Sequence, residues 1–153
     1  MRNWTIHVSV LRDLICFLPG SGELACIEFI KWISSGDSEV IALDYDGFIF
    51  NDYDNLKNDP LIKESGLYKN WIKNILYNDG KTDYFLSWLP QPGRNILKSA
   101  DISDEDIPYF GVAINADKLF AHSKEFCQKA INICSEKFEI VIYDIPENNW
   151  RNA

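Results

Sequence analysis

The sequence predicts an α/β fold with three layers, in which helices flank a mostly parallel central sheet of about four to five short strands. Short apolar runs typical of buried strands alternate along the chain with longer segments of helical periodicity. Strands that are separated by helices favour parallel pairing. The chain has 153 residues, 46% of them hydrophobic, which suits one packed domain over residues 1–153.

The first third of the chain contains two predicted strands and two predicted helices. WTIHVSV is rich in residues that favour strands, so a strand is expected over residues 4–10. A short helix over 11–18 should stop at Pro19-Gly20. Residues 22–36 carry apolar side chains at helical spacing and predict a helix. EVIALD, residues 39–44, is a continuous apolar run typical of a strand that is buried on both faces.

The middle of the chain predicts two helices, over 47–58 and over 61–78, from apolar residues at helical spacing. The segment TDYFLSWL, residues 82–89, is expected to form a short helix or turn that ends at PQPG. Residues 93–103 show no regular pattern and are expected to be irregular. Two tryptophans of this region are expected to serve packing, Trp71 and Trp88.

The last third is expected to run helix, strand, helix, strand. Ser103 is the predicted N-cap of the first of these helices, because acidic residues follow it in the first turn, where negative charge is favourable. The four elements are a helix over 104–115, a strand over 118–123, a helix over 124–137 and a strand over 138–145. The polar tail from about residue 147 is expected to be flexible.

Charge and cysteine content narrow the functional classes. A net charge of −8 argues against binding nucleic acid mainly through the surface field; it suits clustered carboxylates of a metal enzyme or a basic partner equally well. Only two histidines and no CxxC pair are present, so no zinc site is expected. All four cysteines lie in apolar contexts and are predicted to be buried thiols of a reducing compartment: Cys16, Cys26, Cys127 and Cys134. The chain shows no signal peptide and no apolar stretch of roughly 20 residues, so we expect a cytoplasmic protein without a membrane segment.

The motif DYDG at residues 44–47 invites comparison with the nucleophile loop of haloacid-dehalogenase-type phosphatases. That chemistry needs a small hydroxyl residue after the glycine, where Phe48 stands, and a later acidic loop of the form GDxxxD, which is absent from the sequence. The motif should also follow the first strand, whereas a strand and a long helix precede it here. Asp44 and Asp46 are therefore interpreted as a strand end and a helix start, with Asp46 as the candidate N-cap.

Three longer segments together resemble bacterial PIN-domain proteins. ACIEFIKWISSGDSEVIALDYDGFIFNDYDNLK resembles the family's helix, short strand ending in Asp, and following helix, with Asp52 at the acidic place. YFLSWL is similar to its short aromatic segment, and SDEDIPYFGVAINADKLFAHSKEF to its later acidic segment, helix and strand. The resemblance implies a parallel sheet flanked by helices, in agreement with the fold predicted above.

The resemblance also implies cleavage of RNA with Mg²⁺ or Mn²⁺, because hard divalent ions held by carboxylates activate water and neutralise phosphate charge. It places Asp52, Asp104 and Asp106 as metal ligands and catalytic residues, with Asp101 as a further acid nearby. His7 stands where the family pattern has its first Asp, so it is a candidate ligand or general base, or else a strand-end histidine with hydrogen-bond partners.

A second departure falls at the last acidic position of the pattern. There the chain has His122-Ser123-Lys124, with Glu125 as the nearby acid, so the acidic site is partly degenerate.

Three functions stay open on the sequence. The chain is an active metal-dependent ribonuclease (a hydrolase, of the toxin–antitoxin type), a PIN-like module that has lost catalysis and serves binding or regulation, or an acidic immunity or antitoxin-type protein that binds a basic toxin nuclease. The first implies RNA as substrate and an antitoxin as partner, and the last implies a toxin as partner. A homodimer is compatible with the PIN-like alternatives.

Overall fold

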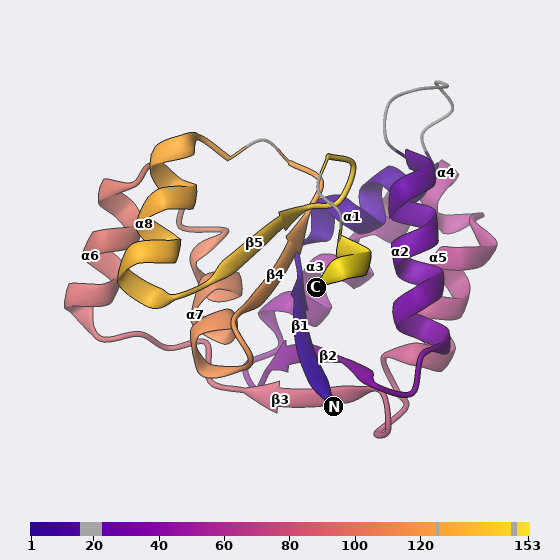
Figure 1. The fold of residues 1–153 in the computed structure, drawn as a ribbon. Coiled ribbons are helices and arrows are strands. Elements are labelled where there is room, and N and C mark those ends of the chain that lie inside the picture. Colours follow the sequence, from indigo (N-terminus) through magenta and orange to yellow (C-terminus); the bar gives the residue numbers. More distant parts are fainter. Residues whose placement is uncertain (16–22, 125, 148–149) are drawn as a thin grey trace.

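The computed structural model describes residues 1–15, 23–124, 126–147 and 150–153, and its centre is an all-parallel sheet of five strands (Figure 1). The strands are β1 (Arg2–Ile6), β2 (Glu39–Asp44), β3 (Thr82–Phe85), β4 (Leu119–His122) and β5 (Val141–Asp144). Their order across the sheet is β3-β2-β1-β4-β5. The predicted α/β fold with a parallel sheet flanked by helices is confirmed.

Helices cover both faces of this sheet, with α2, α4 and α5 on one side and α6 and α8 on the other (Figure 1). The helices of the described residues are α1 (Val8–Arg12), α2 (Glu23–Ser35), α3 (Phe48–Asn55), α4 (Pro60–Lys63), α5 (Gly66–Asn70), α6 (Gln91–Ser99), α7 (Ile107–Asn115) and α8 (Gln128–Phe138). Short 3₁₀ turns occur at Asp13–Ile15, Leu56–Asn58 and Trp150–Asn152, and a π-helical turn at Trp71–Ile75. Across these ranges, none of the helices is long and apolar enough to cross a membrane.

The strand order explains where a site can form. The chain builds the sheet outward from β1 to β2 and β3, and then returns to the other side of β1 to add β4 and β5. The carboxyl ends of β1 and β4 are therefore neighbours from which the chain leaves in different directions. In open parallel sheets this is the place where a crevice opens.

Aromatic side chains dominate the core on both faces of the sheet. Trp4 is fully buried, with its ring 5.4 Å from that of Phe29 in an edge-to-face arrangement. Phe110 on α7 stacks on Phe120 of β4 at 4.6 Å. The helix α7 packs against β1, β2 and β4, so its N-terminus is held close to the carboxyl edge of the sheet.

Several predicted elements differ from the structure. The first strand ends at Ile6, and the Val8–Arg12 segment is helical because the His7 side chain caps it by accepting a hydrogen bond from the Ser9 amide. Residues 82–85 form the edge strand β3 where a helix or turn was expected, because the aromatic run pairs with β2. Residues 91–99, expected in large part to be irregular, form α6, with a proline in its first turn, where no amide donor is needed.

Other boundaries also move. The helix expected over 104–115 begins at Ile107, and Ser103 contributes its backbone carbonyl to the preceding turn rather than a side-chain cap. The helix expected over 61–78 is divided into α4, α5 and the π-helical turn, and the helix expected over 124–137 begins at Gln128. Trp71 is buried as expected, whereas Trp88 is exposed, so the packing role predicted for Trp88 is wrong.

The cysteines and the tail also differ in part from expectation. Cys26 and Cys134 are buried as expected, and burial raises the pKa of Cys134 to about 12. Cys127 is exposed, contrary to the prediction, and Cys16 lies outside the described residues. Beyond residue 147, where a flexible tail was expected, Trp150 is buried and its ring lies 5.2 Å from that of Phe29, which anchors residues 150–152.

The acidic strand end at DYDG is a helix cap, but the capping residue is Asp44 rather than Asp46. The buried Asp44 carboxylate accepts hydrogen bonds from the amides of Phe48 and Ile49, both at 2.9 Å. Gly47 has a φ of 82°, which glycine adopts without strain, and this turn brings the two amides round to the carboxylate. Asp46 is exposed.

We predict that Asp44→Ala lowers the free energy of unfolding by about 2 kcal/mol, the upper end for loss of a helix cap, because two buried amides lose their acceptor. Urea denaturation measures the loss, and Asp46→Ala is the matched control with an expected change below about 0.5 kcal/mol. Equal losses for the two variants would contradict the assignment of the cap.

Candidate functional site

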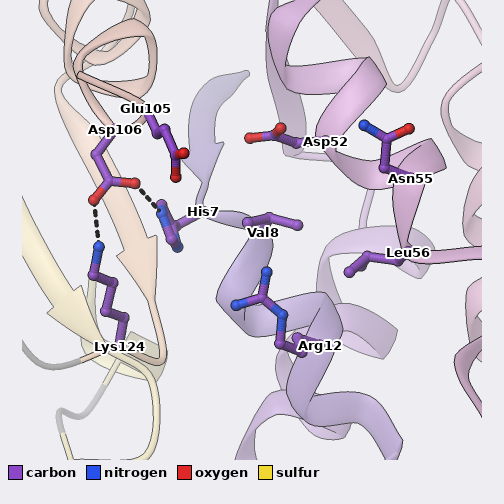
Figure 2. A pocket seen from close by; sticks show the side chains of 9 residues that line it. All are labelled: His7, Val8, Arg12, Asp52, Asn55, Leu56, Glu105, Asp106 and Lys124. Carbon is purple, nitrogen blue, oxygen red and sulfur yellow. Dashed lines mark hydrogen bonds and ion pairs between the residues drawn. The ribbon is translucent and has the colours of Figure 1, made fainter. Parts of the chain in front are cut away.

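A pocket of about 360 Å³ opens at the carboxyl ends of β1 and β4 (Figure 2). Side chains from residues 7–12 and from three positions between 105 and 124 meet there with side chains of α3 and the turn that follows it. The pocket is lined by His7, Val8, Arg12, Asp52, Asn55, Leu56, Glu105, Asp106 and Lys124. Polar and charged groups dominate this wall, which distinguishes it from a cavity left by imperfect packing of the core.

His7 is fixed at the base of the pocket where β1 ends. Its amide donates to the carbonyl of Ala121 in β4 at 2.8 Å, and the carbonyl of the preceding Ile6 accepts from the Tyr53 hydroxyl at 2.5 Å. The side chain is buried and its ring lies 4.8 Å from that of Tyr109. Backbone pairing and aromatic packing thus leave the imidazole one orientation.

The hydrogen bonds of His7 define its tautomer. Nδ1 accepts from the amide of Ser9 at 3.1 Å and lies 2.8 Å from the Ser9 hydroxyl. That hydroxyl oxygen accepts from the amide of Ser123 at 2.9 Å, so its proton is directed to Nδ1. The ring proton therefore resides on Nε2, which donates to Oδ1 of Asp106 at 2.8 Å. Both ring nitrogens are engaged within the protein.

Asp106 is the buried charge around which the site is organised. Its Oδ1 accepts from His7, and its Oδ2 accepts from the ammonium group of Lys124 (Figure 2). Burial raises the pKa of Asp106, but the hydrogen bonds from His7 and Lys124 outweigh it and lower the pKa to about 2. The carboxylate is ionised at neutral pH, and both of its oxygens are occupied.

Asp52 faces the same pocket from α3. It accepts a hydrogen bond of 2.8 Å from the hydroxyl of Tyr109. Burial and the neighbouring Tyr53 and Asp52 raise the pKa of Tyr109, so this phenol stays protonated and donates. Figure 2 shows the carboxylates of Asp52 and Glu105 directed into the pocket from its two sides.

The structure brings together three of the four predicted site residues. His7, Asp52 and Asp106 line one pocket, whereas Asp104 lies apart from it. The Asp104 side chain is 82% exposed and pairs with Lys98 at 3.4 Å. Asp101 is exposed and does not line the pocket, and Glu125 lies outside the described residues.

Sequence reasoning missed four polar residues of the pocket: Arg12, Asn55, Glu105 and Lys124. Lys124 had a usable signal, because it stands where the PIN pattern expects its last acid. A cation in that place is the partner that a buried Asp106 requires. Arg12 gave no signal, since only the helical turn after His7 directs it toward the pocket.

The pocket leaves few unengaged ligands for Mg²⁺ or Mn²⁺. Such ions take several oxygen ligands, usually from carboxylates. Each oxygen of Asp106 already accepts one hydrogen bond, and both nitrogens of His7 are engaged. Over the residues that the structure describes, no group of three or more His, Cys, Asp or Glu side chains is arranged to hold a metal ion.

The trio Ser9, His7 and Asp106 has the composition of a hydrolase triad, but its geometry argues for a structural role. A nucleophilic hydroxyl must face the substrate. Ser9 is buried and is not part of the pocket wall, and its oxygen already accepts from Ser123. What the pocket offers to a ligand is the carboxylates of Asp52 and Glu105 and the guanidinium of Arg12, which suits binding rather than proton transfer.

His122 lies beneath this network as a neutral buried histidine. Its Nδ1 accepts from the amide of Lys124 at 3.2 Å, and its ring lies 4.8 Å from that of Phe126. Nε2 has no hydrogen-bond partner in the described part of the chain. Burial lowers the pKa of His122 to about 4, although its contact with the Lys124 backbone acts in the opposite direction.

Comparison with known proteins gives no relative for this chain: no family model, no curated protein and no solved structure matches it.

We predict that the free energy of unfolding decreases when the pH falls from about 6.5 to about 4. In this window His122 is protonated in the unfolded chain but stays neutral in the folded chain, where its pKa is about 4. The contribution is about 3 kcal/mol at most, and His122→Leu should flatten the slope in this window. Asp106 affects stability at lower pH. Because its folded pKa is about 2, its contribution to the free energy of unfolding is complete above about pH 4 and is lost as the pH falls toward 2. Urea denaturation at stepped pH separates the windows, and an unchanged slope in His122→Leu would refute this assignment.

Proposed function

We propose that this chain is a PIN-like module that has lost catalysis and serves as a binding protein. One observation carries the proposal: both oxygens of Asp106, the best-buried carboxylate of the pocket, are bound by His7 and Lys124. Internal donors thus take the place that a metal-dependent nuclease would keep for its ion. The sheet order and the convergence of His7, Asp52 and Asp106 support the PIN-like part of the proposal.

The energetics favour retention of this internal pairing. Removing one partner from a buried ion pair costs about 3–5 kcal/mol, because the remaining charge stays in a low-dielectric site. A divalent ion that displaced Lys124 would neutralise Asp106 in its place, but it would have to break the existing charge-assisted hydrogen bond and would find few further oxygens there. The arrangement therefore stabilises the metal-free state and leaves Asp52, Glu105 and Arg12 for contact with a partner.

The competing function is a metal-dependent ribonuclease, and it makes opposite demands. It needs at least one ion between carboxylates at the pocket, and that ion would bridge phosphate and water. The acidic wall without an ion repels phosphate. No contact at His7, Asp52 or Asp106 favours that function over the binding module.

Calorimetric titration of the protein with Mn²⁺ is expected to give no binding heat up to millimolar ion. Single-stranded RNA incubated with the protein across Mg²⁺, Mn²⁺ and Co²⁺ is expected to stay intact. Micromolar Mn²⁺ binding, or RNA cleavage that Asp52→Asn abolishes, would overturn the proposal. Asp79→Asn, in an exposed turn far along the sequence from the pocket, is the control for cleavage by a contaminant.

The combined change His7→Asp with Lys124→Ala is expected to create Mn²⁺ affinity, because it removes the internal cation and sets a second carboxylate beside Asp106. Like charges without a counterion destabilise the fold, so Mn²⁺ should raise the melting temperature of this variant by a few degrees, about 1–2 kcal/mol. The wild type should show no such rise.

Lys124→Ala alone tests the pairing of Lys124 with Asp106. Acid unfolding of this variant should begin at a higher pH than that of the wild type, since Asp106 loses a stabilising donor.

If the double variant folds but its melting temperature does not change when Mn²⁺ is added, the pocket has lost the geometry of an ion site.

A further inference from the structure

Five large apolar side chains are exposed along the β3 edge of the sheet and form what we call the aromatic band: Tyr45, Phe48, Tyr84, Leu86 and Trp88. Their exposed fractions run from 47% for Tyr84 to 68% for Tyr45. The Trp88 side chain is 64% exposed, whereas three other tryptophans are buried: Trp4, Trp71 and Trp150. Scattered exposed apolar residues are ordinary, but a contiguous group on a chain with an otherwise well-formed core marks an interaction surface.

Ring stacking and shared pocket walls connect members of the aromatic band in pairs. The rings of Tyr45 and Tyr84 stack with centroids 5.9 Å apart, and the amide of Tyr45 donates to the carbonyl of Phe85. Phe48 lines a pocket of about 300 Å³ and Trp88 an adjoining pocket of about 210 Å³. The two pockets share Asp104 and Pro108, so they are parts of one groove.

The groove continues into the site pocket. The Phe48 pocket and the site pocket share Asp52 and Glu105 in their walls. The carboxylates of Asp52 and Glu105 thus lie between the aromatic band on one side and the internally neutralised Asp106 on the other. This continuity links the exposed apolar surface to the two pocket carboxylates that pair with no cation among the described residues.

The segment that carries Trp88 is held firmly against the fold. Gly111 on α7 approaches Ser87 so closely that a Cβ at residue 111 would lie 2.0 Å from the Ser87 carbonyl oxygen. The side-chain amide of Asn115, one turn later, donates to the carbonyl of Leu86 at 2.7 Å. A surface that is fixed in this way loses little conformational entropy when it binds.

The charges along the groove select the partner. Carboxylates gather where the aromatic rings are exposed: Asp46, Asp52, Asp104 and Glu105. Two cations lie at the Trp88 end, where Lys98 is paired with Asp104 and Arg94 donates to Gln91 at 2.7 Å.

We propose that the aromatic band and its groove bind an extended, arginine-rich segment of a basic partner protein. A guanidinium group stacks on aromatic faces and pairs with carboxylates through two parallel hydrogen bonds, which matches the exposed Phe48 beside Asp52 and Glu105. A second copy of this chain is disfavoured by the net charge of −8 on each copy. This inference rests on the proposed binding function and names the partner and the surface.

The test uses a short fluorescein-labelled peptide of alternating Arg and Gly, a Lys-Gly peptide of equal length and charge, and a single-stranded RNA oligonucleotide. At low ionic strength the Arg peptide is expected to bind, about tenfold more tightly than the Lys peptide, while RNA does not bind. Binding should quench the fluorescence of Trp88. Sedimentation of the free protein should give a monomer, and a dimer buried through the band would overturn the choice of occupant.

Variants locate the binding surface. Trp88→Ala and the pair Asp104→Asn with Glu105→Gln are each expected to weaken the Arg peptide about tenfold. Leu61→Ala and Glu136→Gln, exposed positions outside the groove, are matched controls and should leave the affinity unchanged. Equal affinity for the Arg and Lys peptides, or equal losses in band and control variants, would refute the inference.

The two proposals fail in different ways. Mn²⁺ binding or RNA cleavage refutes the loss of catalysis whatever the peptide does. Absence of Arg-peptide binding to a protein that binds no Mn²⁺ refutes only the partner and the surface.

Discussion

The structure depends on a buried negative charge that the protein neutralises by itself. Asp106 precedes α7, His7 follows β1 and Lys124 follows β4, so one carboxylate ties together the three elements that meet at the centre of the sheet. An unpaired carboxylate in this place would be costly, and the two donors hold it ionised. The same bonds fix the tautomer of His7 and, through Ser9 and Ser123, the loop after β4.

This neutralisation separates two halves of one crevice. Deep in the site pocket, the charges of Asp106 and Lys124 cancel each other, and the histidine has no free nitrogen. Toward the surface, Asp52 and Glu105 remain open and the aromatic band begins. In the proposed binding function, the outer end of this crevice, which is acidic and aromatic, would recognise a side chain of the partner.

Much of the strand and helix order was predictable because it rests on local patterns, whereas β3, α6 and several boundaries depend on tertiary contacts. EVIALD was recognisable as β2 because both faces of that strand are buried. Val8 and Val10 favour strands, yet they lie in a helix that the His7 side chain caps, and no propensity reveals such a cap. Residues 82–85 become a strand only because β2 offers them an edge.

The site residues were likewise predictable only in part. The resemblance identified His7, Asp52 and Asp106 as neighbours, since strand ends and helix starts converge in this fold. The place of Lys124 in the pattern signalled a cation near the site, but its pairing with Asp106 depends on how far a flexible side chain reaches from the β4 loop. Asp104 and Asp106 differ by two positions, yet one is exposed and the other is buried beside the imidazole.

The position of β1 has a consequence for the growing chain. Trp4 pairs on one side with Ile41 and on the other with Leu119, so β1 is synthesised before both of its neighbours and gains the second one only after β2 and β3 have been made. Until then one side of β1, with Ile6 and the capped turn at His7, has no strand beside it. An unpaired strand edge of this kind is prone to association during synthesis, and in this fold the arrival of β4 closes that edge and delivers Lys124 to Asp106 at the same time.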